Sequence, residues 1–325
     1  MKAITQNAYG SPEVLELSDI DQPVAHDDAV LLRVHAAAVN PYDWHVMRAD
    51  PHLVRLMGLA LRRPKNSVRG VDVAGRVEAV GTSVRRFRPG DEVFGLCYPG
   101  EGAFAEYACT QEGRLAPKPH NLTFEQAAAV PVAALTALGC LRDVGRPRPG
   151  QMVLVNGASG GVGTFAVQLA RSFDAEVTGV CSTKNVDLVR SLGADHVIDY
   201  TREDLTRNRR RYDVVLDNVG NHSVAQFRSM LAPGGKHILN NGAGGRWFGP
   251  AWRLLDGAVR SVFADRKTVS GRMTEQTEDL VLLKELLEAG TITPVIDRTY
   301  PLSRTPEAIR YLERGHARGK VIIAG

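Results

Sequence analysis

The stretch that most constrains this chain runs over residues 152–173 and reads MVLVNGASGGVGTFAVQLARSF. Its first four residues are apolar, which is typical of a buried parallel strand. After a turn rich in glycine, apolar residues recur at helical spacing, at Val162, Phe165, Ala166, Leu169, Ala170 and Phe173. The sequence therefore predicts a strand that enters a glycine turn and leaves it as a helix.

The glycine turn has the composition of a dinucleotide-binding loop in its variant that begins with alanine, Ala158-Ser159-Gly160-Gly161-Val162-Gly163. Missing side chains let the turn be tight, let backbone N–H groups approach a pyrophosphate, and let the helix pack close to the strand. A tight strand-to-helix turn without a ligand is the alternative. A second strand, over residues 175–181, follows the helix directly, so the required βαβ context is present and favours a bound dinucleotide.

The middle of the chain continues to alternate between strands and helices. We expect strands over 196–199, 213–217, 236–240 and 267–271, with helical segments between them. This pattern predicts an α/β fold, a Rossmann doubly wound parallel sheet of about six strands. Thr123 with Gln126 is expected to cap one helix, and Thr305 with Pro306 to begin another.

The two ends of the chain have β-rich sequences, and we expect them to form a second, mainly β domain. The predicted domains are 1–122 with 291–325, and 123–290. Residues 51–63 are apolar at helical spacing, which predicts a short amphipathic helix that covers the β core or walls a substrate cleft.

Composition limits the partners. The chain has 325 residues, enough for two cores, and its net charge of +4 comes from 40 basic and 36 acidic residues. This near balance of charges does not favour nucleic-acid binding. The basic runs at 62–65 and 207–211 lack the interleaved aromatic residues of a base-stacking surface, so we expect them to be solvated loops. Neither a membrane-length apolar run nor an apolar leader is present, and four scattered cysteines indicate reduced thiols. We therefore expect a cytoplasmic protein without membrane or nucleic-acid partners.

The residues after the second strand of the βαβ unit predict which dinucleotide binds. NAD enzymes place an acid there to bind the ribose hydroxyls. This chain has Ser182, Thr183 and Lys184 instead, and hydroxyls with an ammonium would hold a 2′-phosphate. We therefore predict NADPH. The alternative is that Ser182 and Thr183 cap the next helix while Lys184 is solvated.

Five motifs together point to a known family: NPYD at 40–43, GVDVAG at 70–75, RPGDEV at 88–93, the glycine turn, and GHARGKV at 315–321. With them the whole chain resembles the medium-chain dehydrogenase/reductase superfamily, and within it the zinc-free quinone oxidoreductase and enoyl or alkenal reductase branch. The resemblance implies a GroES-like domain packed on a Rossmann domain, an active site between them, and a homodimer.

Departures from the zinc-dependent branch shape the expected chemistry. Alcohol dehydrogenases of this superfamily bind catalytic zinc through a cysteine near the position of Asn40 and a histidine after the glycine that Gly70 resembles. Here Val71 and Asp72 follow Gly70, and a structural zinc would need more cysteines than Cys97 and Cys109. We therefore expect no metal. Hydride addition to an already electrophilic small molecule, a quinone or an α,β-unsaturated carbonyl, remains possible without a Lewis acid.

The resemblance also suggests cofactor contacts. Thr136 resembles a residue near the nicotinamide ribose and phosphates, Tyr200 one near the adenosine, and Lys320 one that reaches the cofactor from the GroES-like domain. Asn218, and Asn241 with Gly242, follow strand ends that face the cofactor crevice. Each has a plainer alternative, namely a helix cap, a core edge or a surface lysine.

For catalysis we single out Asn40, Tyr42 and Asp43. Asn40 or Tyr42 is expected to hydrogen-bond the acceptor oxygen as negative charge develops, and Asp43 to orient the loop or the substrate. The alternative is a structural turn fixed by Pro41. A different class of function, a non-catalytic NADPH-binding redox sensor or scaffold, also remains open.

Overall fold

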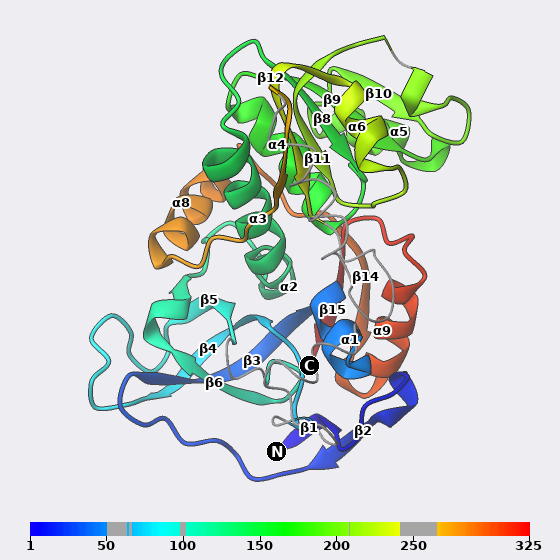
Figure 1. The fold of residues 1–325 in the computed structure, drawn as a ribbon. Helices are drawn as coiled ribbons and strands as arrows, with labels where there is room; N and C mark the ends of the chain where they lie inside the picture. Colours follow the sequence, from blue (N-terminus) through cyan, green and yellow to red (C-terminus); the bar gives the residue numbers. More distant parts are fainter. Residues whose placement is uncertain (51–63, 65–66, 98–101, 208, 241–264) are drawn as a thin grey trace. The chain divides into compact units, whose positions relative to one another are not determined.

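The computed structural model describes residues 1–50, 64, 67–97, 102–207, 209–240 and 265–325 (Figure 1). The predicted helix over 51–63 lies outside the described residues. Contacts divide the chain into two compact units, Met1–Leu135 with Glu275–Gly325, and Thr136–Thr274. The functional domain boundaries expected from the sequence, after residue 122 and before residue 291, stay predictions.

The second unit contains the predicted Rossmann sheet. Its six strands lie in the order β10-β9-β8-β11-β12-β13, and every neighbouring pair is parallel. The order reverses direction between β8 and β11, which is where doubly wound sheets bind ligands. The strands are β8 Met152–Asn156, β9 Glu176–Cys181, β10 His196–Asp199, β11 Tyr212–Asp217, β12 Leu231–Leu239 and β13 Lys267–Ser270.

Burial in this unit goes further than the apolar pattern predicts. The helix after the glycine turn, α4 (Gly161–Ser172), buries Thr164, Val167 and Gln168, which the predicted apolar face does not include, while Val162 is half-buried. The strand β12 begins five residues before the predicted start at 236, because Leu231 already pairs with Tyr212 before a register shift over a Pro-Gly-Gly sequence. The shorter helices are α5 Val186–Ser191 and α6 Val224–Ser229, and a π-helix over Gly139–Gly145 continues from α3 (Pro131–Leu138).

The first unit is the mainly β domain, and its larger sheet combines strands from the N-terminal part of the chain with the two C-terminal strands. The C-terminal strand β15 (Lys320–Ala324) pairs antiparallel with β3 (Ala29–Val39), with Val321 opposite Val39. The sheet order is β14-β15-β3-β4-β5-β7, with β6 also on β3, while β1 and β2 form a separate pair. The remaining strands are β1 Lys2–Gln6, β2 Leu15–Asp19, β4 Asp72–Val80, β5 Glu92–Leu96, β6 Tyr107–Gln111, β7 Leu115–Pro117 and β14 Ile296–Pro301.

Helix starts in the first unit test two capping predictions. Thr123 caps α2 (Phe124–Ala128), and the reciprocal bonds with Gln126 are formed, as predicted. The prediction for Thr305 is wrong by one position: Arg304 is the N-cap of α9, and Thr305 lies inside the helix because a 3₁₀ turn already precedes it and its hydroxyl donates to the Leu302 carbonyl. The helices are α1 Pro41–Arg48, α2, α3 Pro131–Leu138, α8 Thr277–Glu288 and α9 Thr305–Glu313.

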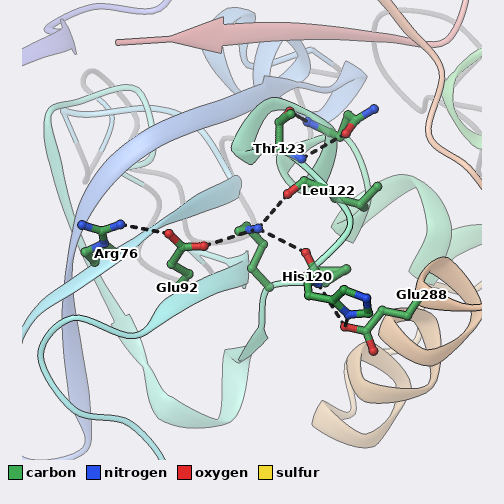
Figure 2. A network of polar contacts seen from close by, with 9 residues as sticks. Arg76, Glu92, His120, Leu122, Thr123 and Glu288 are labelled. Atoms are coloured by element: carbon green, nitrogen blue, oxygen red, sulfur yellow. Dashed lines mark hydrogen bonds and ion pairs between the residues drawn. The ribbon is translucent and has the colours of Figure 1, made fainter.

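A polar network fastens α8 to the segment that follows β7 (Figure 2). The side chain of Glu288 accepts bonds from both the backbone N–H and the ring of His120, and it also pairs with Lys284. The ammonium of Lys118 donates to the carbonyls of Pro119 and Leu122 and lies 3.4 Å from Glu92. The segment after β7 is therefore held by side chains from both β5 and α8.

Among the residues that the structure describes, no helix is long and apolar enough to span a membrane. The four cysteines are free thiols. Burial raises the pKa of Cys140 and of Cys181 to about 11, so both stay protonated at neutral pH.

Candidate active site

The glycine turn of the second unit fits a dinucleotide pyrophosphate. Gly157 has a φ of +79° and Gly160 is the N-cap of α4, so the backbone N–H groups of the helix start are open to a ligand. A Cβ on Gly163 would lie 2.0 Å from the carbonyl oxygen of Gly157, so only glycine allows the helix to pack this close to the strand. The predicted residues Ser159, Gly160, Gly161, Val162 and Gly163 therefore form a backbone cradle of the expected kind.

The parallel register brings the other predicted cofactor residues of this unit to the same edge of the sheet. Asp199 is opposite Cys181, and Asp217 is opposite both Asn156 and Leu239. Residues that follow these strand ends therefore gather beside the glycine turn, and they include Ser182, Thr183, Lys184, Tyr200 and Asn218. Tyr200 and Lys184 are exposed there.

The loop after β9 contains one residue that the sequence analysis missed. Asn185 is 5% exposed, and its amide donates to the hydroxyls of Ser159 at 3.0 Å and Ser182 at 3.3 Å. It therefore ties the glycine turn to the segment predicted to select the cofactor. In the sequence, Asn185 is only the last residue of the polar run Ser-Thr-Lys-Asn after the strand, which indicates a role in this loop weakly. Its burial in the structure is what distinguishes it from a surface residue.

Thr183 faces an acid that the sequence analysis did not weigh. Its hydroxyl donates to Asp199 at 2.5 Å, and Asp199 also accepts the backbone N–H and hydroxyl of Thr201. Burial acts to raise the pKa of Asp199, but these hydrogen bonds outweigh it and lower the pKa. An ionised carboxylate thus already uses the Thr183 proton, which leaves Lys184 and Ser182 as the stronger candidates for a 2′-phosphate.

A buried acid organises the loop after β11, and it too was missed. One oxygen of Asp217 accepts bonds from Asn156 and from the backbone N–H groups of Val219 and Gly220, at 2.8 to 3.1 Å. Burial acts to raise its pKa, but hydrogen bonds, with the imidazole of His237 3.8 Å away, lower it. Asp217 therefore fixes the backbone around Asn218, whose own amide donates to the Asn156 carbonyl and accepts from Asn240.

Two cofactor predictions remain, one for Thr136 and one for Asn241 with Gly242, and the structure describes only the first of these positions. Thr136 lies on α3 and is 9% exposed. Asn241 and Gly242 lie outside the described residues.

In the first unit, Asn40, Asp72 and Lys320 form a buried polar triad. The Lys320 ammonium donates to the Asn40 amide oxygen at 2.5 Å and to Asp72 at 2.9 Å. The Asn40 amide nitrogen donates to the same Asp72 oxygen at 2.9 Å. All three residues are at most 3% exposed.

Strand register explains why these three distant residues meet. Val321 lies opposite Val39 and Ala38 lies opposite Asp72, so the start of β15, the end of β3 and the start of β4 come together. The second oxygen of Asp72 accepts the backbone N–H of Val132 at 2.8 Å. The triad is therefore anchored to the first turn of α3, the helix that carries Thr136.

The triad changes how the predicted catalytic residues are interpreted. The Asn40 amide already bonds Lys320, Asp72 and the Ala38 carbonyl, so it has little capacity left for a substrate oxygen. The carboxylate of Asp43 accepts the backbone N–H of Asn40 at 2.7 Å and is buried, so it holds the start of α1. Tyr42, on the same turn, is 41% exposed and presents its side chain at the surface of the unit.

The whole chain matches known oxidoreductases. Residues 26–120 match the alcohol dehydrogenase GroES-like domain, and residues 192–323 match the zinc-binding dehydrogenase family. The NAD(P)H oxidoreductase RTN4IP1, mitochondrial, of Bos taurus is 36% identical over 370 residues, which cover 99% of this chain and 89% of the relative. The chain belongs to the medium-chain dehydrogenase/reductase family.

Further relatives of this medium-chain dehydrogenase/reductase are named for different substrates. The NADPH-dependent alkenal/one oxidoreductase, chloroplastic, of Arabidopsis thaliana is 36% identical over 341 residues, covering 99% of this chain and 79% of the relative. The solved quinone oxidoreductase of Coxiella burnetii has a TM-score of 0.88 and 29% identity, covering 100% of this chain and 99% of that chain. This medium-chain dehydrogenase/reductase is thus an NAD(P)H-dependent oxidoreductase.

The zinc-dependent members of the family raise the question of whether a metal fits here. In the described part of the chain, no group of three or more His, Cys, Asp or Glu side chains is placed to hold a metal ion. At the positions that resemble zinc ligands, Val71 has no donor atom, and Asn40 is bonded to the Lys320 ammonium. A divalent cation beside this ammonium would be repelled in a site sheltered from water, so these residues do not fit a zinc ion.

Proposed function

We propose that this protein is a zinc-independent, NADPH-dependent reductase that transfers a hydride to a quinone or an α,β-unsaturated carbonyl. The observation that carries the proposal is the buried triad of Asn40, Asp72 and Lys320. It puts an amide, bonded to an ammonium, at the position where the family resemblance implies a zinc-binding cysteine in zinc-dependent members. An acceptor that is already electrophilic needs no Lewis acid to take a hydride.

In this proposal the cofactor supplies a hydride from its nicotinamide ring when bound. The residues of the second unit bind and orient it: the glycine turn donates backbone N–H groups to the pyrophosphate, and Lys184 pairs with the 2′-phosphate. Ser182 adds a hydroxyl beside Lys184. Holding the donor against the acceptor carbon supplies much of the rate.

Tyr42 is the proposed hydrogen-bond donor to the acceptor oxygen, where negative charge develops during the reaction. Asn40 and Asp43 act as positioning residues, since their side chains fix the start of α1 on which Tyr42 lies. The activities for which the alkenal and quinone oxidoreductase relatives are named support both substrate classes.

The first test is NADPH oxidation by chelator-treated protein, with an enone and a quinone as separate acceptors and each product identified. Turnover of either acceptor at the rate of untreated protein supports the proposal. Loss of turnover on chelation, restored by zinc, would contradict it. Tight NADPH binding without turnover of either acceptor would instead favour a redox sensor or scaffold. Tyr42→Phe is expected to lower kcat about tenfold or more, and Tyr107→Phe is the matched control.

Cofactor preference is tested with Lys184→Glu. The acid would repel the 2′-phosphate, so the ratio of kcat/KM for NADPH over NADH should fall about tenfold or more. Lys267→Glu is the matched control, because Lys267 is an exposed lysine at the opposite, amino-terminal edge of the same parallel sheet. An unchanged preference in Lys184→Glu would remove the basis for assigning NADPH.

Three further expectations belong to this proposal. They are a homodimer, a cytoplasmic location, and functional domains bounded at residues 122 and 291. Size-exclusion chromatography with light scattering tests the first, and limited proteolysis tests the last.

A further inference from the structure

A cavity rich in arginine lies in the first unit, between β14 and α9. Its volume is about 630 Å³, within the range of small-molecule sites. Four arginines and one glutamate contribute its charged lining, and two tyrosines contribute its aromatic lining. All of these residues belong to β14, α9 and the turns that flank α9, and the proposed reductase chemistry uses none of them.

Half of this positive charge has a partner. Arg304 pairs with Glu307 one turn along α9, and Arg310 pairs with Glu13 at 2.7 Å. Within the described ranges, neither Arg298 nor Arg314 has an ion-pair partner. The cavity therefore keeps two guanidinium groups whose charge is not neutralised by a neighbouring carboxylate.

The acid next in sequence does not neutralise Arg298. The carboxylate of Asp297 accepts the hydroxyl of Tyr311 at 2.7 Å and the backbone N–H of Arg318 at 2.9 Å. Burial and this bond to Asp297 raise the pKa of Tyr311, so the phenol stays a neutral donor. Asp297 thus holds the tyrosine in place and leaves the guanidinium beside it available.

Two of the four arginine side chains lie against aromatic rings. The guanidinium of Arg298 lies 4.3 Å from the centre of the Tyr311 ring, and that of Arg304 lies 5.7 Å from the centre of the Tyr300 ring. Stacking holds a guanidinium on the ring while N–H groups at its edge can still donate, and Tyr311 and Tyr300 beside Arg298 raise the pKa of that guanidinium. A fixed, planar set of donors matches the oxygens of a phosphate group in a two-point contact.

We propose that this cavity binds a small phosphorylated molecule through Arg298 and Arg314. Two guanidiniums without a carboxylate partner match a group that carries two or more negative charges, as a pyrophosphate or a phosphate ester does. The cavity is lined by residues of the first unit alone, whereas the glycine turn belongs to the second unit, and the proposal does not depend on the proposed reductase activity.

Inorganic pyrophosphate is the probe. It is titrated by calorimetry into protein loaded with one equivalent of NADPH, which occupies the glycine turn, and sodium chloride of equal ionic strength is the reference. The double variant Arg298→Gln with Arg314→Gln is expected to weaken binding about tenfold or more, since it removes charge-assisted hydrogen bonds. Arg298→Lys should weaken binding too, because an ammonium keeps the charge but loses the two-point contact.

The matched control is Arg86→Gln, which removes another exposed arginine stacked on an aromatic ring, 5.2 Å from the centre of Phe87, outside this cavity. It should bind pyrophosphate like the wild type. Equal affinity in the double variant and the wild type would overturn the proposal. So would full affinity in Arg298→Lys, or heats that sodium chloride reproduces, because either result would show general attraction to a positive surface.

Discussion

The glycine turn of the second unit and the Asn40–Asp72–Lys320 triad of the first unit are built in opposite ways. The turn is a continuous run of six residues whose backbone is proposed to bind the cofactor, and its key requirement is the absence of a side chain at Gly163. The triad joins three side chains from three strand ends, with Asn40 and Lys320 separated by 280 positions. One site is a property of a short sequence, and the other exists only once a sheet has formed.

This difference predicts different responses to mutation. A backbone cradle depends on space, so added atoms should harm it and most side-chain exchanges around it should not. In a buried triad the opposite charges compensate each other. Removing one charged member should therefore lower the free energy of unfolding more than removing both charged members. Four single variants, ordered from the largest to the smallest expected loss of stability, test this difference between backbone space and buried charge.

Lys320→Met should have the largest effect. It leaves the Asp72 carboxylate buried without a cation, and such losses cost about 3–5 kcal/mol in the free energy of unfolding. Adding Asp72→Asn should recover part of this loss, which urea denaturation of both variants measures. Arg48→Met, which removes a more exposed ion pair with Glu313, is the control and should cost about 1 kcal/mol or less. Equal losses in the two single variants would mean that the triad is not coupled.

Gly163→Ala should come next. Its Cβ would meet the Gly157 carbonyl at 2.0 Å, so the helix must shift, at about 1–3 kcal/mol of stability and with weaker NADPH binding. Gly160→Ala is the control, because a Cβ there would lie 3.5 Å from its nearest neighbour. Thermal unfolding compares the two variants, and the same loss of stability in both would refute the steric explanation.

Asp217→Asn tests a side chain that accepts hydrogen bonds from the backbone of the loop after β11, where the cofactor is proposed to bind. It should cost about 1–3 kcal/mol at neutral pH, because the amide replaces an ionised acceptor of three hydrogen bonds. The folded pKa of Asp217 is lowered, so its stabilisation is present above the ordinary pKa of 3.8 and is lost as pH falls through the folded pKa. The difference between wild type and variant should therefore shrink below about pH 4, and a difference that grows toward acid would contradict this assignment.

Asn185→Ala should have the smallest effect. It removes one hydrogen bond from the loop after β9 to Ser159 of the glycine turn and one within that loop to Ser182, worth about 1 kcal/mol in net stability. Affinity for NADPH should fall more than affinity for NADH, since the loop carries Lys184. Ser191→Ala, on the same helical segment and bonded only to a carbonyl one turn back, is the control for both measurements.

Much of the fold could be predicted because its signals are local. The strands β8, β10 and β13 and the helix after the glycine turn occur where short apolar runs and helical spacing indicate them. The start of β12 was missed, because its first residues pair with β11 before a register shift. The shift contains a Pro-Gly-Gly sequence, which by itself predicts a turn and not a strand. The cap at Thr305 was missed by one residue, because a preceding 3₁₀ turn is not visible in the sequence.

The candidate site divides in the same way. That Ser182, Tyr200 and Asn218 lie at one edge of the sheet could be predicted, because the carboxyl ends of parallel strands meet there, and their contacts with a cofactor stay predictions. Asn185 and Asp217 could not, because buried polar residues resemble surface ones in a sequence. Lys320 was predicted as a cofactor contact, and whether it reaches a bound cofactor stays a prediction. In the structure its ammonium is bonded to Asn40 and Asp72.

The sequence by itself determined the strand, glycine turn and helix of the second unit, since neighbouring residues supply both the apolar period and the missing side chains. Only the tertiary structure decided that an ammonium, a carboxylate and an amide share one buried position in the first unit. The reason is that burial and charge compensation depend on strand register, and register pairs residues that are hundreds of positions apart.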